Sequence, residues 1–305
     1  MHLTQWKPIM KPLVLTALLA FAAGNTFAVT STSVIVTAET PKSAPAPSLT
    51  AHDTIALVNK QPITIASWHA LRDDPAGVEL WIMIDDGTDS GIGAQFNDIR
   101  AFIRQQPAEV KVAIGYLRNG SVVTVQKPTA DHEAAIKTIR LPFAQPGISG
   151  SPYIALSDFL HKLPVAPQPR EIVFISSGID PYYPGFAPEN PYLQRAIQDS
   201  QKAGVPIYTV YYSSAGHAGH SFWLISSGQN DLSYLSEETG GEFYWQGNSN
   251  PVALQPFFDD INRRVAEQYV VKFEVPGAHR GFERLRLRTE FPHVSLVGPS
   301  QVYIQ

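Results

Sequence analysis

The stretch VELWIMIDDG at residues 78–87 is a short apolar run that ends in two acids, Asp85 and Asp86. A continuous run of this length is typical of a buried parallel strand, here one with carboxylates at its C-terminal end. Similar runs occur at residues 171–175 and 205–211, and segments with helical spacing of apolar residues lie at residues 93–106, 154–163 and 192–203. This alternation predicts an α/β fold with a doubly wound, mostly parallel sheet and helices on both faces.

The chain changes character toward its C-terminal end. Helices are predicted at residues 232–239 and 251–266, and short alternating strands follow at residues 269–275, 284–289, 294–297 and 301–304. We therefore expect the main domain to span residues 78–271 and a C-terminal antiparallel β extension to span residues 272–305.

The N-terminal residues have the pattern of a secretory signal peptide. Lys7 and Lys11 precede an apolar run at residues 13–23, and small side chains end the segment at Ala28. The apolar run is shorter than the roughly 20 residues that a membrane-spanning helix needs. We expect residues 1–28 to be removed, leaving an exported protein, periplasmic or extracellular, without a stable membrane span.

Two segments separate this signal from the main domain. Residues 29–53 are rich in Ser, Thr, Ala and Pro, which predicts a flexible linker. Residues 54–77 have a weak pattern and are interpreted as an N-terminal extension that packs on the domain.

Composition excludes several classes of protein. The chain has 305 residues, of which 44% are hydrophobic, and contains no cysteine, so it is neither a disordered chain nor a disulfide-stapled miniprotein, and it has no thiol nucleophile. With 23 Lys and Arg against 27 Asp and Glu, the net charge is -4. Nucleic acid is not an expected partner, because binding to phosphates needs clustered basic residues.

Polar residues follow the predicted parallel strands. Loops after such strands converge at one edge of an open sheet, which is where ligands bind. The candidate residues on the first loop are Asp85, Asp86, Gly87, Thr88, Asp89 and Ser90, and those on two later loops are Ser151, Ser177 and Asp180.

Together these loops resemble those of a von Willebrand factor A domain. The stretches are IDDGTDS at residues 84–90, GSP at residues 150–152 and ISSG at residues 175–178, supported by KAGVPIY at residues 202–208 and LSEETGGE at residues 235–242. The resemblance covers residues 78–271 and is closest in character to secreted bacterial proteins related to this family. It implies a von Willebrand factor A/Rossmann-like fold. It also implies a metal-ion-dependent adhesion site, where oxygen ligands hold Mg²⁺ and an acidic side chain of a protein partner completes the coordination.

The adhesion site is degenerate in this sequence. The family pattern is Asp-x-Ser-x-Ser, with a Thr and a final Asp from the other two loops. Asp85 matches the first Asp, but Gly87 and Asp89 stand at the two Ser positions, while the offset pattern Asp86-x-Thr88-x-Ser90 keeps the hydroxyls. Ser151 matches the Thr and Ser177 replaces the final Asp, with Asp180 three residues later.

Asp85, Asp89 and Ser151 are therefore the metal-ligand candidates, with Mg²⁺ as the expected cofactor if the site is functional. An equally weighted alternative is that the acids shape the turn before the first helix, where Asp is favoured by the helix N-terminus.

The sequence favours a non-catalytic protein-binding module, for adhesion or as a scaffold. One alternative is a cell-envelope enzyme that uses the strand-end acids or His217 and His220, which lie three residues apart in a glycine-rich loop. No third metal ligand stands near these imidazoles, and Ser177 lacks the G-x-S-x-G motif of a hydrolase nucleophile. A second alternative is a structural subunit with a vestigial site.

Overall fold

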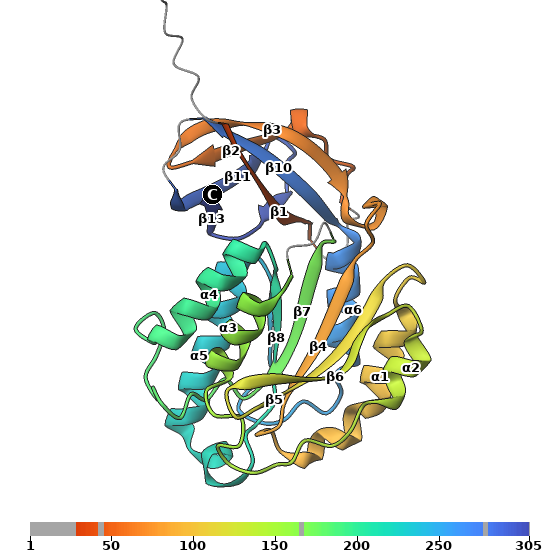
Figure 1. Cartoon of the computed structure of the whole chain (residues 1–305), viewed down its shortest axis with the longest axis vertical. Coiled ribbons are helices and arrows are strands. Elements are labelled where there is room, and N and C mark those ends of the chain that lie inside the picture. Colours follow the sequence, from red (N-terminus) through yellow and green to blue (C-terminus); the bar gives the residue numbers. More distant parts are fainter. Residues whose placement is uncertain (1–28, 42–45, 165–167, 277–279, 305) are drawn as a thin grey trace, which may run out of the picture.

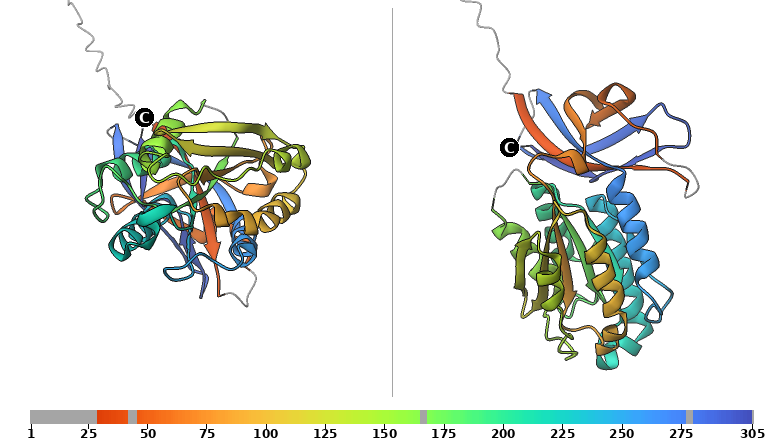
Figure 2. Two further views of the ribbon diagram at one scale, coloured as in Figure 1. Left: turned by 90° about the horizontal axis from the view of Figure 1, so that it is seen from below. Right: turned by 90° about the vertical axis from the view of Figure 1, so that its right-hand side faces the viewer.

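The structure is a computed structural model that describes residues 29–41, 46–164, 168–276 and 280–304. The predicted signal peptide lies outside the described residues. An α/β body carries a separate antiparallel sheet at one end, as Figures 1 and 2 show. No helix within the described ranges combines the length and apolar character that crossing a membrane requires.

The body contains the predicted mostly parallel sheet. Six strands are arranged in the order β6-β5-β4-β7-β8-β9, and all neighbours are parallel except β5 and β6. These two form a hairpin with Asn119 and Gly120 at its turn, where both residues have positive φ, as is typical of an Asn-Gly turn. The strands are β4 (Glu79–Asp85), β5 (Lys111–Arg118), β6 (Ser121–Thr129), β7 (Arg170–Ser176), β8 (Ile207–Tyr211) and β9 (Phe243–Tyr244).

Helices cover both faces of this sheet. One face packs against α1 (Phe96–Gln105), α2 (His132–Lys137) and α6 (Gln255–Ala266), and the other against α3 (Pro152–Lys162), α4 (Pro191–Ala203) and α5 (Phe222–Thr239). A hydrophobic core lies on each face of the sheet, and successive residues of β4 pack into one or the other. Ile82 and Ile84 face α1, whereas Trp81 and Met83 face α3. Two 3₁₀ turns, η3 (Ser90–Gln95) and η4 (Gly216–His220), lie in the loops after β4 and β8.

Helix α5 is longer than the sequence pattern predicts. It begins at Phe222, capped by the Ser221 hydroxyl, ten residues before the predicted start. Gly228 weakens the apolar pattern there, yet glycine is required because a Cβ at this position would lie 2.2 Å from the carbonyl oxygen of Ser177. The close approach brings α5 directly against the loop that follows β7.

The second sheet has seven strands in the order β12-β1-β10-β3-β2-β11-β13, and every neighbouring pair with a described register is antiparallel. Its strands are β1 (Val29–Glu39), β2 (Thr54–Val58), β3 (Gln61–Ala70), β10 (Gln268–Pro276), β11 (Gly281–Thr289), β12 (Ser295–Val297) and β13 (Gln301–Ile304), with short 3₁₀ turns η1 (Ala51–Asp53) and η2 (Leu71–Asp73).

The prediction of a flexible linker is wrong for residues 29–39, which form β1. Val34 and Val36 are buried in a third core together with Val271 and Phe273 of β10. The predicted N-terminal and C-terminal extensions are likewise parts of this one sheet and not separate additions. The reason is that strand pairing joins segments more than 200 residues apart, which local composition does not reveal.

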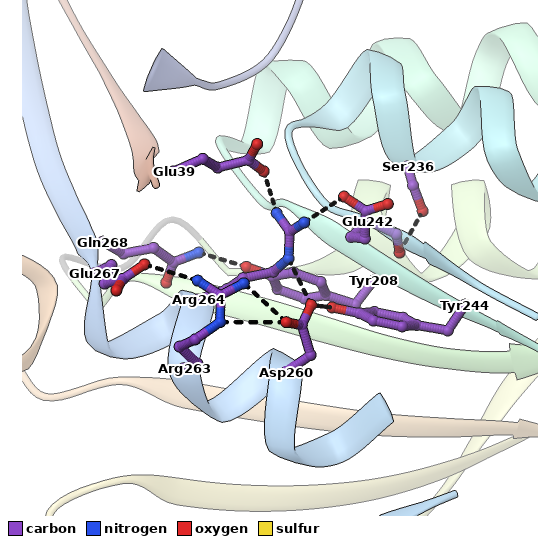
Figure 3. A network of polar contacts seen from close by, with 10 residues as sticks. All are labelled: Glu39, Tyr208, Ser236, Glu242, Tyr244, Asp260, Arg263, Arg264, Glu267 and Gln268. Atoms are coloured by element: carbon purple, nitrogen blue, oxygen red, sulfur yellow. Dashed lines mark hydrogen bonds and ion pairs between the residues drawn. The ribbon is translucent and has the colours of Figure 1, made fainter. Parts of the chain in front are cut away.

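A partly buried ion network joins the two sheets, as Figure 3 shows. The Arg264 guanidinium, on the last turn of α6, binds Glu39 at the end of β1, Glu242 before β9 and Asp260 one helical turn earlier. Its side chain is only 12% exposed. Because α6 leads directly into β10, these contacts fix the antiparallel sheet to the body at the point where the chain crosses between them.

Candidate functional site

The three predicted loops meet at the carboxyl edge of the parallel sheet. They line a hollow of about 250 Å³ whose polar lining includes Asp85 and Gly87 from the first loop, Ser149 from the second, and Ser177 and Asp180 from the third. Residues from the loop after β8 and from the start of α5, Ser214, Ala218 and Leu224, close one side. Four chain-distant segments thus build one concave surface, where open α/β sheets bind ligands.

Asp85 lies at the floor of the hollow and is buried. Its Oδ1 accepts the Gly87 N–H at 2.7 Å and its Oδ2 accepts the Ser176 hydroxyl at 2.8 Å. Burial raises the pKa of this carboxyl, against hydrogen bonds from Gly87, Ser176 and Ser149 that lower it. The tight turn also explains Gly87, because a Cβ there would lie 3.0 Å from Asp85 Oδ1 and 3.2 Å from Ser149 Oγ.

Asp180 supplies the second carboxylate of the hollow. Its Oδ2 accepts the Ser151 hydroxyl at 2.7 Å, and its Oδ1 accepts the Tyr182 N–H at 2.9 Å. Ser151 also caps α3, where its Oγ accepts the Ile154 N–H. The pair therefore ties the second loop to the third, and Ser151 itself does not line the hollow.

The offset set of Asp86, Thr88 and Ser90 is used elsewhere. Asp86 is buried and forms a bidentate pair with Arg140, at 2.6 and 2.8 Å, and the guanidinium lies 3.7 Å from the centre of the Tyr116 ring. The Thr88 hydroxyl donates to the Asp85 carbonyl oxygen at 2.7 Å. Ser90 is exposed at the start of η3.

Asp89 does not contribute to the hollow. Its Oδ1 accepts the Gly91 N–H at 2.7 Å and so caps η3, and its own N–H donates to the Ser213 carbonyl oxygen. The alternative interpretation gave the acids of the first loop the role of shaping the turn, and both Asp89, which caps η3, and Asp85, which accepts the Gly87 N–H, take part in it.

The predicted metal ligands Asp85, Asp89 and Ser151 do not converge. Asp85 lines the hollow, Asp89 caps η3, and the Ser151 hydroxyl donates a hydrogen bond to Asp180. Within the described ranges no group of three or more His, Cys, Asp or Glu side chains is placed to hold a metal ion. Asp85, Asp89 and Ser151 therefore do not supply three ligands to one octahedral Mg²⁺ ion.

Exposed aromatic side chains flank the hollow, a feature that the sequence could not assign. Tyr182 is 62% exposed, next to Pro181 in the hollow wall, and Phe222 and Trp223 at the start of α5 are 72% and 60% exposed. The Trp223 indole N–H donates to the carbonyl oxygen of Pro184, another wall residue. We call the hollow and these three aromatic residues the rim.

No pattern in the sequence indicated the roles of Ser149 and Arg140 at these loops. Ser149 lines the hollow beside Asp85, and Arg140 neutralises Asp86. His217 and His220 lie on η4, but in the described part of the chain neither is hydrogen bonded to Ser177 or Asp180, and neither lines the hollow.

The strand order, with one antiparallel edge strand and functional loops at the carboxyl edge, defines a von Willebrand factor A-like fold. No protein-family model matches this chain, and no curated protein matches it.

Several solved structures resemble it in chain path. The PilB minor pilin from Streptococcus sanguinis is 14% identical, with 63% of this chain and 62% of that chain covered and a TM-score of 0.48. A von Willebrand factor type A protein from Catenulispora acidiphila is 10% identical, with 92% and 75% covered and a TM-score of 0.43. The manganese-loaded TRAP protein of Plasmodium vivax is 9% identical, with 82% and 98% covered and a TM-score of 0.41.

Proposed function

We propose that this protein is an exported, non-catalytic protein-binding module and that the rim is its contact surface. The observation that carries the proposal is that Asp85 and Asp180, from loops about a hundred residues apart, line the same hollow beside exposed aromatic side chains. Exposed Tyr, Trp and Phe next to a concave polar site are typical of the anchors of protein interfaces.

The chemistry of the hollow selects the group that a partner supplies. An acidic partner side chain would need a metal ion to bridge it to the carboxylates, and the three predicted ligands do not converge on one. Without that ion, the described lining of the hollow carries two carboxyl groups and no basic side chain. A Lys or Arg side chain of the partner complements it directly, with Asp85 and Asp180 as acceptors of its N–H groups. This basic group replaces the acidic one that the family resemblance implied.

The contacts at the hollow support binding over catalysis. The Ser151 hydroxyl donates to the Asp180 carboxylate at 2.7 Å, its oxygen accepts the Ile154 N–H at the start of α3, and it does not line the hollow, so it holds the loops together. The Ser177 Oγ accepts the Ile179 N–H at 3.4 Å and has no described contact with a histidine. We therefore assign these hydroxyls to shaping the loops.

Capture of a partner from an envelope extract tests the proposal. Wild-type protein should retain the same partner in excess chelator and in millimolar Mg²⁺. The double variant Asp85→Asn/Asp180→Asn should lose it, while Asp89→Asn should keep it, because that acid lies outside the hollow and Asn caps a helix equally well.

Trp223→Ala should weaken capture at unchanged melting temperature, and Phe291→Ala on the antiparallel sheet should not. Capture that survives in the double variant would favour a structural subunit with a vestigial rim. Capture that disappears only in chelator would show that a metal is required.

A further inference from the structure

A second cavity, of about 340 Å³, lies at the other end of the parallel sheet from the rim, and the two share no lining residue. It is enclosed by the first residues of β4 and β7, the C-terminal ends of α1 and α6, and the turn η2 of the antiparallel sheet. Its wall is mostly apolar and includes Leu71, Val78, Leu80, Val110 and Val265. A cavity of this size and lining is suited to a small organic molecule.

Three charged side chains line this cavity, of which Arg72 and Glu109 are exposed and Glu171 is buried. Glu171, the second residue of β7, is 1% exposed, and its Oε1 has no hydrogen-bond partner. No basic side chain of the described residues forms an ion pair with it. A buried carboxylate without a counter-ion is costly, and proteins normally pair such a group.

Gln268 contacts Glu171, yet one carboxylate oxygen of Glu171 remains without a donor. Gln268, at the start of β10, hydrogen bonds to Glu171. Its amide N–H also donates to the Tyr208 hydroxyl at 2.7 Å, a bond that Figure 3 shows. The Gln268 Oε1 is also buried without a partner. Glu171, which lines the cavity, and Gln268, which contacts it, therefore each keep one unsatisfied acceptor oxygen. A positively charged group with several N–H donors pairs with the Glu171 carboxylate, and a primary ammonium has three such donors.

We propose that this cavity binds a small molecule with an apolar body and a primary ammonium group, which pairs with Glu171. The apolar body fills the space between Leu80, Val110 and Val265. The charge of the ligand and that of Glu171 neutralise each other. This site is independent of the rim and of the function proposed for it.

The test uses n-hexylamine as the probe and 1-hexanol as its uncharged match, with binding followed at pH 8 by calorimetry and by the shift in melting temperature. A ligand that binds only the folded state must raise that temperature. Hexylamine should bind wild type saturably and at least tenfold more tightly than hexanol. Glu171→Gln should lose at least tenfold in hexylamine affinity, whereas Glu109→Gln, an exposed acid at the mouth of the cavity, should not.

Val265→Phe provides a second variant that keeps Glu171 but fills the cavity, and it should also abolish hexylamine binding. The proposal is overturned if wild type shows no saturable binding of hexylamine. It is also overturned if hexanol binds equally well, or if Glu171→Gln or Val265→Phe binds hexylamine as tightly as wild type.

Discussion

The buried carboxyl of Glu171 gives the sharpest prediction about stability. Burial raises its pKa from 4.5 to about 7, against a hydrogen bond from Gln268 that lowers it. The folded protein therefore holds this proton more tightly than the unfolded chain does. Above a pH of about 4.5 the unfolded chain releases the proton first, so the free energy of unfolding falls as pH rises, until the folded state has also lost it above pH 7.

The size of the effect follows from the shift. A difference of roughly 2.5 pKa units at about 1.4 kcal/mol per unit corresponds to about 3 kcal/mol of stability lost between pH 5 and pH 8.5. Glu171→Gln removes the titration. The variant should gain about 3 kcal/mol relative to wild type over this range, on top of any constant difference from the altered hydrogen bonds.

Urea unfolding of both proteins at several pH values measures this difference. Burial raises the pKa of Asp231 to about 7 and also raises the pKa of Asp85. Both carboxyls are present in the two proteins, so their effects on stability cancel in the difference. Glu109→Gln is the matched control and should follow wild type, because Glu109 is exposed. If the stabilities of wild type and Glu171→Gln change in parallel with pH, the argument about the buried carboxyl is wrong.

Three further predictions concern the junction, the loops and the metal. Arg264→Met should lower the free energy of unfolding by about 2 kcal/mol in urea denaturation, because it removes the shared partner of the partly exposed Glu39, Glu242 and Asp260, while the more exposed Arg263→Met should cost about 1 kcal/mol or less. Gly178→Ala should lower the free energy of unfolding by at least about 3 kcal/mol in the same assay, because its Cβ would lie 2.3 Å from the Gly228 carbonyl oxygen. Gly147→Ala is the control: it has a similar positive φ but open space, and should lower the free energy of unfolding by only about 1 kcal/mol. Equal losses for the two variants would contradict this reasoning. Calorimetric titration with millimolar Mg²⁺ should give no heat of binding and no rise in melting temperature, and a saturable signal would contradict the absence of fit for the metal.

The α/β body could be predicted from the sequence because its signals are local. Apolar runs such as residues 78–84 and 171–175 are buried strands, and the acids and hydroxyls placed at their ends do reach one edge of the sheet. The antiparallel sheet could not be predicted in the same way. The partners of β1 lie more than 200 residues away in β10, and the Thr and Ser of residues 30–33 resemble those of a linker.

The site was only partly predictable for a related reason. The strand pattern predicted that the loops of Asp85, Asp89 and Ser151 meet at one edge of the sheet. It did not predict the direction in which each side chain points. The Asp89 side chain caps η3, and the Ser151 hydroxyl donates a hydrogen bond to Asp180. The pairing of Asp86 with Arg140 across 54 residues and the isolation of Glu171 inside the body are tertiary facts without a local motif.

The central claim is that carboxylates of the rim receive a basic side chain of a protein partner directly. A double-mutant cycle on the purified complex tests it, combining Asp180→Asn with replacement of the partner's Lys or Arg by Met, in chelator throughout. The claim predicts a coupling free energy of at least about 1.5 kcal/mol for Asp180 and a value near zero for the same cycle with Asp89→Asn. A cycle in which Asp180 shows no coupling to any basic residue of the partner would contradict it.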